Sequence, residues 1–147
     1  MVRWSCIALF ALGGCAAPIT EVVVQVDSDF DVPSELSAIE IEVTSPDDVT
    51  QTAMADLGGM EAELPRTLSL VQEAAPLGPY RVRVTGFRRG MMLLRRDAEF
   101  TFVRDESRLL RLDLEQACES VRCNGNETCE AGDCRDRDVT ADELQPL

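Results

Sequence analysis

Apolar and polar residues alternate with a period of two over most of the chain after residue 20. The apolar members of the alternating stretches are Val22, Val24 and Val26, Ile39, Ile41 and Val43, Leu68 and Leu70, Val82 and Val84, Phe100 and Phe102, and Leu110, Leu112 and Leu114. Successive side chains of a β-strand point to opposite faces of its sheet, so this pattern predicts strands with one buried and one solvent-facing side. Antiparallel sheets have such strands, whereas the strands of a covered parallel sheet are apolar on both faces.

Glycine, proline and aspartate separate these stretches at residues 45–48, 57–59 and 76–79, as expected for turns. The sequence Arg88-Arg89-Gly90 predicts a hairpin turn in which Gly90 supplies a positive φ, followed by a strand that begins near Met91. Only residues 32–38 and 51–57 resemble short helices, and neither has a long amphipathic pattern.

This spacing of strands and turns predicts an all-β fold. We expect a small antiparallel β-sandwich over residues 21–117, either Ig-like or transthyretin-like, followed by a short segment held by disulfides. The choice between these superfamilies stays open, because the only tryptophan is Trp4 and the core cysteine–tryptophan pattern of antibody domains is missing.

The N-terminus has the order of a secretory signal. Arg3 precedes a short apolar run that ends in two glycines before Cys15. This run is shorter than the roughly 20 apolar residues that a membrane-spanning helix needs. The sequence Leu12-Gly13-Gly14-Cys15 resembles the lipobox of bacterial lipoproteins. That resemblance implies cleavage before Cys15, attachment of lipid to its thiol, and anchoring to a membrane through the acyl chains.

These features predict a lipoprotein signal peptide at residues 1–14, and a lipidated cysteine with a short tether at 15–20. The alternative is an ordinary secretory signal that is cut near Ala17. The residue after the cysteine is Ala16 and not an aspartate. By resemblance to the sorting rules of Gram-negative lipoproteins, this implies transport to the outer membrane. We therefore expect the mature chain outside the cytoplasm, in the cell envelope.

Four cysteines follow the last expected strand of the sandwich: Cys118, Cys123, Cys129 and Cys134. An even set of cysteines in an exported chain predicts disulfides, whose pairing the spacing leaves open. A zinc site of four thiolates is the alternative, although such sites usually contain closer pairs of cysteines. Residues 118–134 resemble part of an EGF-like module, and this resemblance implies the interleaved pairs Cys118–Cys129 and Cys123–Cys134. The polar and acidic residues 135–147 predict a disordered tail.

The composition argues against several classes of function. The formal net charge is −13, and an acidic surface repels nucleic-acid backbones, so no nucleic-acid partner is expected. The chain has no histidine, which removes the usual general base and the common catalytic triads. No phosphate-binding loop, nucleophile elbow or dinucleotide fingerprint is found. We therefore expect no enzyme and no cofactor.

Two features are candidates for binding. Asp27, Asp29 and Asp31 would share one face of an extended strand, which makes them weak candidates for a Ca²⁺ site, although the EF-hand pattern fails. The apolar run at 91–94 lies between the arginine pairs at 88–89 and 95–96, and we expect it to serve as core and edge contact with a solvated hairpin end. The alternative is a docking patch, and if a protein partner binds, this is the first place to look.

The order of lipobox, tether, alternating strands and terminal cysteines resembles that of lipoproteins from Gram-negative bacteria with GC-rich genomes. This resemblance implies location in the cell envelope and brings no known activity with it. The expected function is therefore that of a membrane-anchored, extracytoplasmic lipoprotein with a non-catalytic binding or structural β-sandwich. The alternative is a Ca²⁺- or small-ligand-binding module of the envelope, and an enzyme is the least favoured class.

Overall fold

A computed structural model describes residues 17–147 except 61, 62 and 75. The expected signal peptide at 1–14 and the lipidation site Cys15 lie outside the described residues. Nearly all regular structure in the described part is β, apart from one 3-10 turn, η1 (Gln116–Cys118). In that part, no helix is long and apolar enough to cross a membrane.

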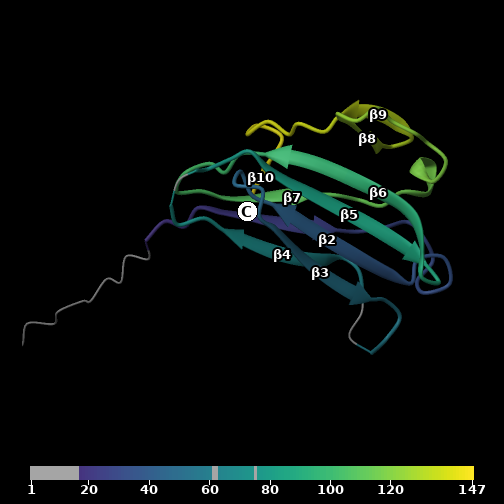
Figure 1. Cartoon of the computed structure of the whole chain (residues 1–147). Helices are drawn as coiled ribbons and strands as arrows, with labels where there is room; N and C mark the ends of the chain where they lie inside the picture. Colours follow the sequence, from purple (N-terminus) through teal and green to yellow (C-terminus); the bar gives the residue numbers. More distant parts are fainter. Residues whose placement is uncertain (1–16, 61–62, 75) are drawn as a thin grey trace, which may run out of the picture.

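Two four-stranded sheets form a β-sandwich (Figure 1). The first sheet has the order β10-β7-β1-β4, and the second has the order β3-β2-β5-β6. The strands of the sandwich are β1 (Glu21–Val26), β2 (Ala38–Thr44), β3 (Thr50–Asp56), β4 (Arg66–Val71), β5 (Tyr80–Arg88), β6 (Met91–Phe100), β7 (Ser107–Arg111) and β10 (Gln145–Pro146). A small separate hairpin consists of β8 (Glu127–Glu130) and β9 (Asp133–Asp136).

Neighbouring strands are antiparallel except for β1 and β7, which pair in parallel from Glu21 opposite Ser107 to Gln25 opposite Arg111. The all-β class, the antiparallel sheets and the terminal disulfides predicted from the sequence are confirmed. The alternating sequence pattern could not predict the single parallel pair, because β1 and β7 each have one face toward the core and one toward solvent, as antiparallel strands do.

The core lies between the two sheets and consists of the apolar residues that alternate in the sequence. The triplet at Val22, Val24 and Val26 is fully buried, and the intervening residues are half-buried. An aromatic group closes one end of the core, where the ring of Phe102 meets Tyr80 at 5.0 Å and Phe100 at 5.1 Å between centroids. Burial of such side chains stabilises the fold by about 25 cal/mol for each Å² of apolar surface removed from water.

Three local predictions have different outcomes. The turn before Met91 is confirmed, because Arg89 and Gly90 both have positive φ, 50° and 80°, as a two-residue hairpin turn requires. The helix expected at 51–57 is wrong, since Thr50–Asp56 forms strand β3. The helix expected at 32–38 is also wrong: this segment forms only a turn, in which the backbone N–H groups of Glu35 and Leu36 donate to the carbonyl of Asp31.

The segment after β7 covers one open side of the sandwich. Disulfides Cys118–Cys129 and Cys123–Cys134 connect η1, β8 and β9, which confirms the interleaved pairing and makes the four-thiolate zinc alternative wrong. On strand β6, the N–H of Asp97 donates to Thr128 Oγ1, and the N–H of Glu99 donates to the carbonyl of Arg137 at 2.9 Å. The terminal segment therefore lies along the edge of β6 (Figure 1).

The expectation of a disordered tail at 135–147 is wrong for this structure. Strand β10 adds to the edge of β7, and the side chain of Leu144 is fully buried in the core. The turn before it is held by Glu143, whose carboxylate accepts hydrogen bonds from the N–H and the hydroxyl of Thr140. The buried Leu144 and the pairing of β10 with β7 together hold the tail, although the surrounding residues are polar.

Because the tail packs into the core, replacing its buried leucine should lower the free energy of unfolding much more than replacing its exposed leucine. Leu144→Ala should lower the free energy of unfolding by about 2–5 kcal/mol, because it leaves a cavity between the sheets. Leu147→Ala, at an exposed leucine of the same segment, should change it by less than about 0.5 kcal/mol. Urea unfolding of both variants measures the difference, and equally small effects would show that the tail does not pack into the core.

Candidate binding groove

The sandwich is open on the side opposite the disulfide segment. Strands β3 and β4 are the last strands of their sheets on that side. Between them lies a groove of about 370 Å³, which we call the edge groove. It is lined by Ile41, Val43, Ser45, Val49, Gln51, Thr52, Ala53, Leu68, Ser69, Leu70, Val71, Gln72, Tyr80 and Phe102.

Small side chains on β3 create this groove. Ala53 lies opposite Ile41, and Ala55 lies opposite Ile39, so both alanines occupy core-facing positions of the edge strand. Of these two, Ala53 lines the groove together with Gln51, and its methyl group leaves space where a larger side chain would narrow the gap between the sheets. Because of that space, Leu68 and Leu70 on the facing strand β4 stay only half-buried.

Exposed apolar residues surround the same end of the sandwich. Val49 and Val71 line the groove and have more than half of their surface exposed, and Met54 on β3 is 62% exposed. Isolated exposed apolar residues are ordinary on a protein surface, but the position of Val49 and Val71 in the lining of a groove is typical of an interaction site.

The chain enters the sandwich beside the edge groove. The carbonyl of Thr20 accepts a hydrogen bond from the N–H of Gln72, a residue that lines the groove. The neighbouring Ile19 is exposed. The segment that leads back to Cys15 therefore begins at this end of the molecule.

A larger hollow of about 530 Å³ lies where residues 99–104 meet 138–141. Its aromatic residues Phe100 and Phe102 are themselves buried, so their rings offer little of the surface that lines it. Apolar ligand sites need accessible apolar lining, and the edge groove provides more of it.

The predicted acidic face serves the fold instead. Asp29 Oδ1 accepts from the N–H of Gln116 at 2.7 Å, and Asp27 Oδ1 accepts from the N–H of Ser28. The N–H of Asp31 donates to Glu35. The structure does not gather Asp27, Asp29 and Asp31 into one ligand set, and among residues 17–147, with the stated gaps, no cluster of three metal-binding side chains occurs.

The hairpin patch expected at 91–94 is smaller than the sequence suggested. Met91 and Met92 are exposed, but Leu94 is buried in the core. Of the arginines around it, Arg88 pairs with Glu119 at 3.1 Å, and Arg96 points inward and is 6% exposed. The hairpin therefore presents two methionines, without a cluster of four exposed positive charges.

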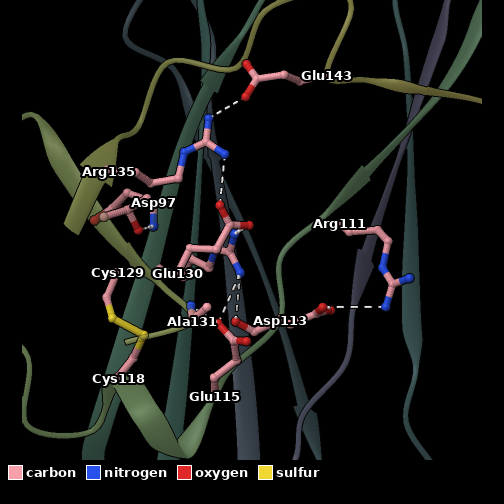
Figure 2. Close-up of polar contacts among 12 residues, drawn as sticks. Asp97, Arg111, Asp113, Glu115, Cys118, Cys129, Glu130, Ala131, Arg135 and Glu143 are labelled. Carbon is pink, nitrogen blue, oxygen red and sulfur yellow. Dashed lines mark hydrogen bonds and ion pairs between the residues drawn. A yellow bond between two sulfur atoms is a disulfide. The ribbon is translucent and has the colours of Figure 1, made fainter. Parts of the chain in front are cut away.

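The buried Arg96 takes part in a polar network with the terminal segment, whose residues Glu130, Arg135 and Glu143 are seen in Figure 2. Its guanidinium donates to Glu130 of β8 and to the carbonyl of Asp113, at 3.1 Å. Glu130 also accepts from Arg135 of β9 at 2.8 Å, and Arg135 in turn pairs with Glu143. The sequence pattern did not reveal this network, since Arg96 follows Arg95 in a hairpin where charged residues are usually solvated.

The network shifts the ionisation of its carboxylates. The hydrogen bond from Arg135, followed by that from Arg96, lowers the pKa of Glu130. The backbone N–H of Thr140, followed by Arg135, lowers the pKa of Glu143 to about 2. The same two carboxylates raise the pKa of Arg135. All of these groups lie on the covered side, so the network stabilises the terminal segment and leaves the edge groove without strongly shifted groups.

The depressed carboxylate pKa values predict acid sensitivity. A carboxylate with a lower pKa in the folded state stabilises it above the unfolded pKa, near 4.5, and loses that contribution as the pH falls. The free energy of unfolding should therefore fall from about pH 5 down to about pH 2. The Glu130→Gln/Glu143→Gln double variant should show a shallower fall in denaturant titrations across this range. An unchanged slope would contradict a role for these two groups.

Comparisons with family models, with curated proteins and with solved structures found no match to this chain.

Proposed function

We propose that this chain is a lipid-anchored, extracytoplasmic binding protein without catalytic activity, and that the edge groove is its binding site. The observation that carries this proposal is the asymmetry of the sandwich. The terminal segment covers β6 and β7, whereas the core between β3 and β4 is accessible through a groove with apolar lining. A preformed concave apolar site is the usual form of a binding site for an apolar group.

The location outside the cytoplasm is supported by the cysteines. Disulfides persist in oxidising compartments, and two of them hold residues 118–134, a segment too short to keep a shape through its own core. The lipobox-like sequence that ends at Cys15 supports membrane attachment by resemblance.

The groove would then lie close to the membrane. Five extended residues reach at most about 18 Å, so the short segment from Cys15 to Thr20 would keep this end of the sandwich near the lipid surface. The ligand would therefore be a component of the envelope or a segment of a neighbouring envelope protein.

The absence of chemistry at the groove supports a binding role. The chain contains no histidine. In the described part of the chain, the groups with resolved pKa shifts are Arg83, Glu130, Arg135 and Glu143, and none of them lines the edge groove. A small apolar ligand in the same groove is the second candidate, because Leu68 and Leu70 are accessible there.

If Cys15 carries the lipid anchor, replacing its thiol by a hydroxyl group should change the cell fraction in which the protein is found. After expression of the full chain in a Gram-negative host, the wild type should sediment with membranes and carry acyl mass on Cys15. Cys15→Ser should appear in the soluble extracytoplasmic fraction with no acyl mass. Fractionation with intact-mass analysis measures both properties. The same distribution for both chains, without acyl mass, would contradict the anchor.

The groove predicts binding of a neutral apolar probe. N-phenyl-1-naphthylamine should gain fluorescence with the wild type, because the groove shields it from water. Ala53→Leu should reduce its affinity at least about tenfold, since one buried leucine side chain fills roughly the space of a small ligand group. Thr67→Leu is the matched control, because it adds the same side chain to the outer face of β4 at a residue that does not line the groove. Equal effects of the two variants would contradict binding in the groove.

A further inference from the structure

We propose that the occupant of the edge groove is an extended segment of a cationic partner protein, which adds to β3 as a new strand of the second sheet. This inference rests on the binding role of the groove proposed above. Strand addition supplies affinity through backbone hydrogen bonds and specificity through alternate side chains that enter a pocket. Both elements are present at β3.

The backbone of β3 offers the hydrogen-bonding groups. The N–H of Leu57 donates to the carbonyl of Ser37, and the N–H of Ser45 donates to the carbonyl of Val49, which fixes the phase of the ladder with β2. In an antiparallel ladder, residues alternate between groups that face the partner and groups that face away. The backbone N–H and C=O groups of Thr50, Thr52 and Met54 therefore point away from β2, along the free edge of the sheet.

The side chains of β3 do not protect this edge. Natural edge strands usually carry charges, prolines or bulges that prevent pairing with another chain. From Thr50 to Ala55, β3 has neither a charged residue nor a proline, and its pairing with β2 continues without a bulge. The edge of β6 is covered by the terminal segment, and the edge of β7 by β10.

The groove fits the inward side chains of an added strand. A strand beside β3 would direct every second residue toward the groove at Ala53. There it would contact Leu68 and Leu70 of β4 and close the opening between the sheets. Valine, isoleucine or leucine at these positions would bury apolar surface on both partners.

The outer face favours basic residues at the other positions. Glu40 lies opposite Met54, so its carboxylate stands one strand away from the docking edge. Glu42 lies opposite Thr52, but it is also opposite Arg83 of β5, which offsets part of its charge. Glu40 takes part in no ion pair of the described residues. The formal net charge of −13 disfavours a second copy of this chain and favours a cationic partner.

Strand β4 is a weaker docking edge. The N–H of Gln72 donates to Thr20, so the backbone groups of Thr67, Ser69 and Val71 point outward in the same way. The neighbouring strand β1 presents Val23 and Gln25 on that outer face. Its one carboxylate there, Glu21, accepts a hydrogen bond from Ser107. Charge complementarity therefore selects β3.

The test uses two blocked peptides that are as long as β3, 7 residues. One alternates valine with arginine, and the other alternates valine with glutamate. In calorimetric titrations, the basic peptide should bind, with an affinity that falls as salt is added, and the acidic peptide should not bind.

Matched proline variants distinguish the two edges. Thr52→Pro removes an outward N–H from β3 and leaves the bonds to β2 intact, which is the position that a strand tolerates for proline. It should weaken binding of the basic peptide at least about tenfold, because one backbone bond and the local fit are lost. Thr67→Pro, at an outward position of β4 that does not line the groove, should change the affinity less than about twofold if β4 is not the docking edge.

A second variant does not depend on how β3 tolerates proline. Glu40→Arg, on the outer face, should weaken the binding of the basic peptide and should allow the acidic peptide to bind. Failure of the basic peptide to bind, equal binding of both peptides, or equal effects of the two proline variants would overturn the proposal. A concentration-dependent dimer that Thr52→Pro abolishes would also overturn it, because a second copy would then be the occupant.

The probe experiment separates this inference from the proposed function. If N-phenyl-1-naphthylamine binds in a manner that Ala53→Leu abolishes while the basic peptide does not bind, the groove is a site for small apolar ligands and strand addition is wrong. If neither probe binds, the binding role of the groove is wrong as well.

Discussion

The guanidinium of Arg96 is the charge on which the arrangement of the C-terminal third depends. It lies on the core-facing side of β6 and is 6% exposed, so it requires partners that compensate for the loss of water. Glu130 and the carbonyl of Asp113 accept from its two terminal nitrogens, whereas its Nε is buried without a hydrogen-bond partner among the described residues. Glu130 is fixed in turn by Arg135 (Figure 2). Since β8 carries Glu130, the ion pair between Arg96 and Glu130 holds the disulfide hairpin against β6.

This placement gives the two sides of the sandwich different properties. On one side, hydrogen bonds to Thr128 and Arg137 cover β6, and β10 extends the sheet beyond β7. On the other side, β3 and β4 have no such cover in the described part of the chain, and Ala53 leaves the core accessible between them. A sandwich must manage four edge strands, and this one protects two of them with its own terminal segment. The remaining pair is where a ligand would complete the structure.

The sequence predicted the parts of the fold that have strong alternation. Strands such as β1 and β2 follow from their buried valines and isoleucines, and the hairpin follows from Gly90. It did not predict β3, because an edge strand with Ala53 and Ala55 toward the core lacks the contrast between apolar and polar positions by which alternation indicates a strand. It also missed β10, whose pairing relies on two residues and on the single buried Leu144. The edge groove was missed for the same reason as β3, since small residues at an edge become visible only when the facing strand is known.

Hydrogen exchange of backbone amides in the folded protein tests the central claim most directly, which is that one side of the sandwich is covered and the other is open. The outward amides of Asp97 and Glu99 on β6 donate to the terminal segment, so they should exchange slowly. Those of Thr52 and Met54 on β3 should exchange quickly, while Ala53 between them, bonded to β2, stays protected. Equal protection on both edges, or fast exchange at Asp97 and Glu99, would contradict the account.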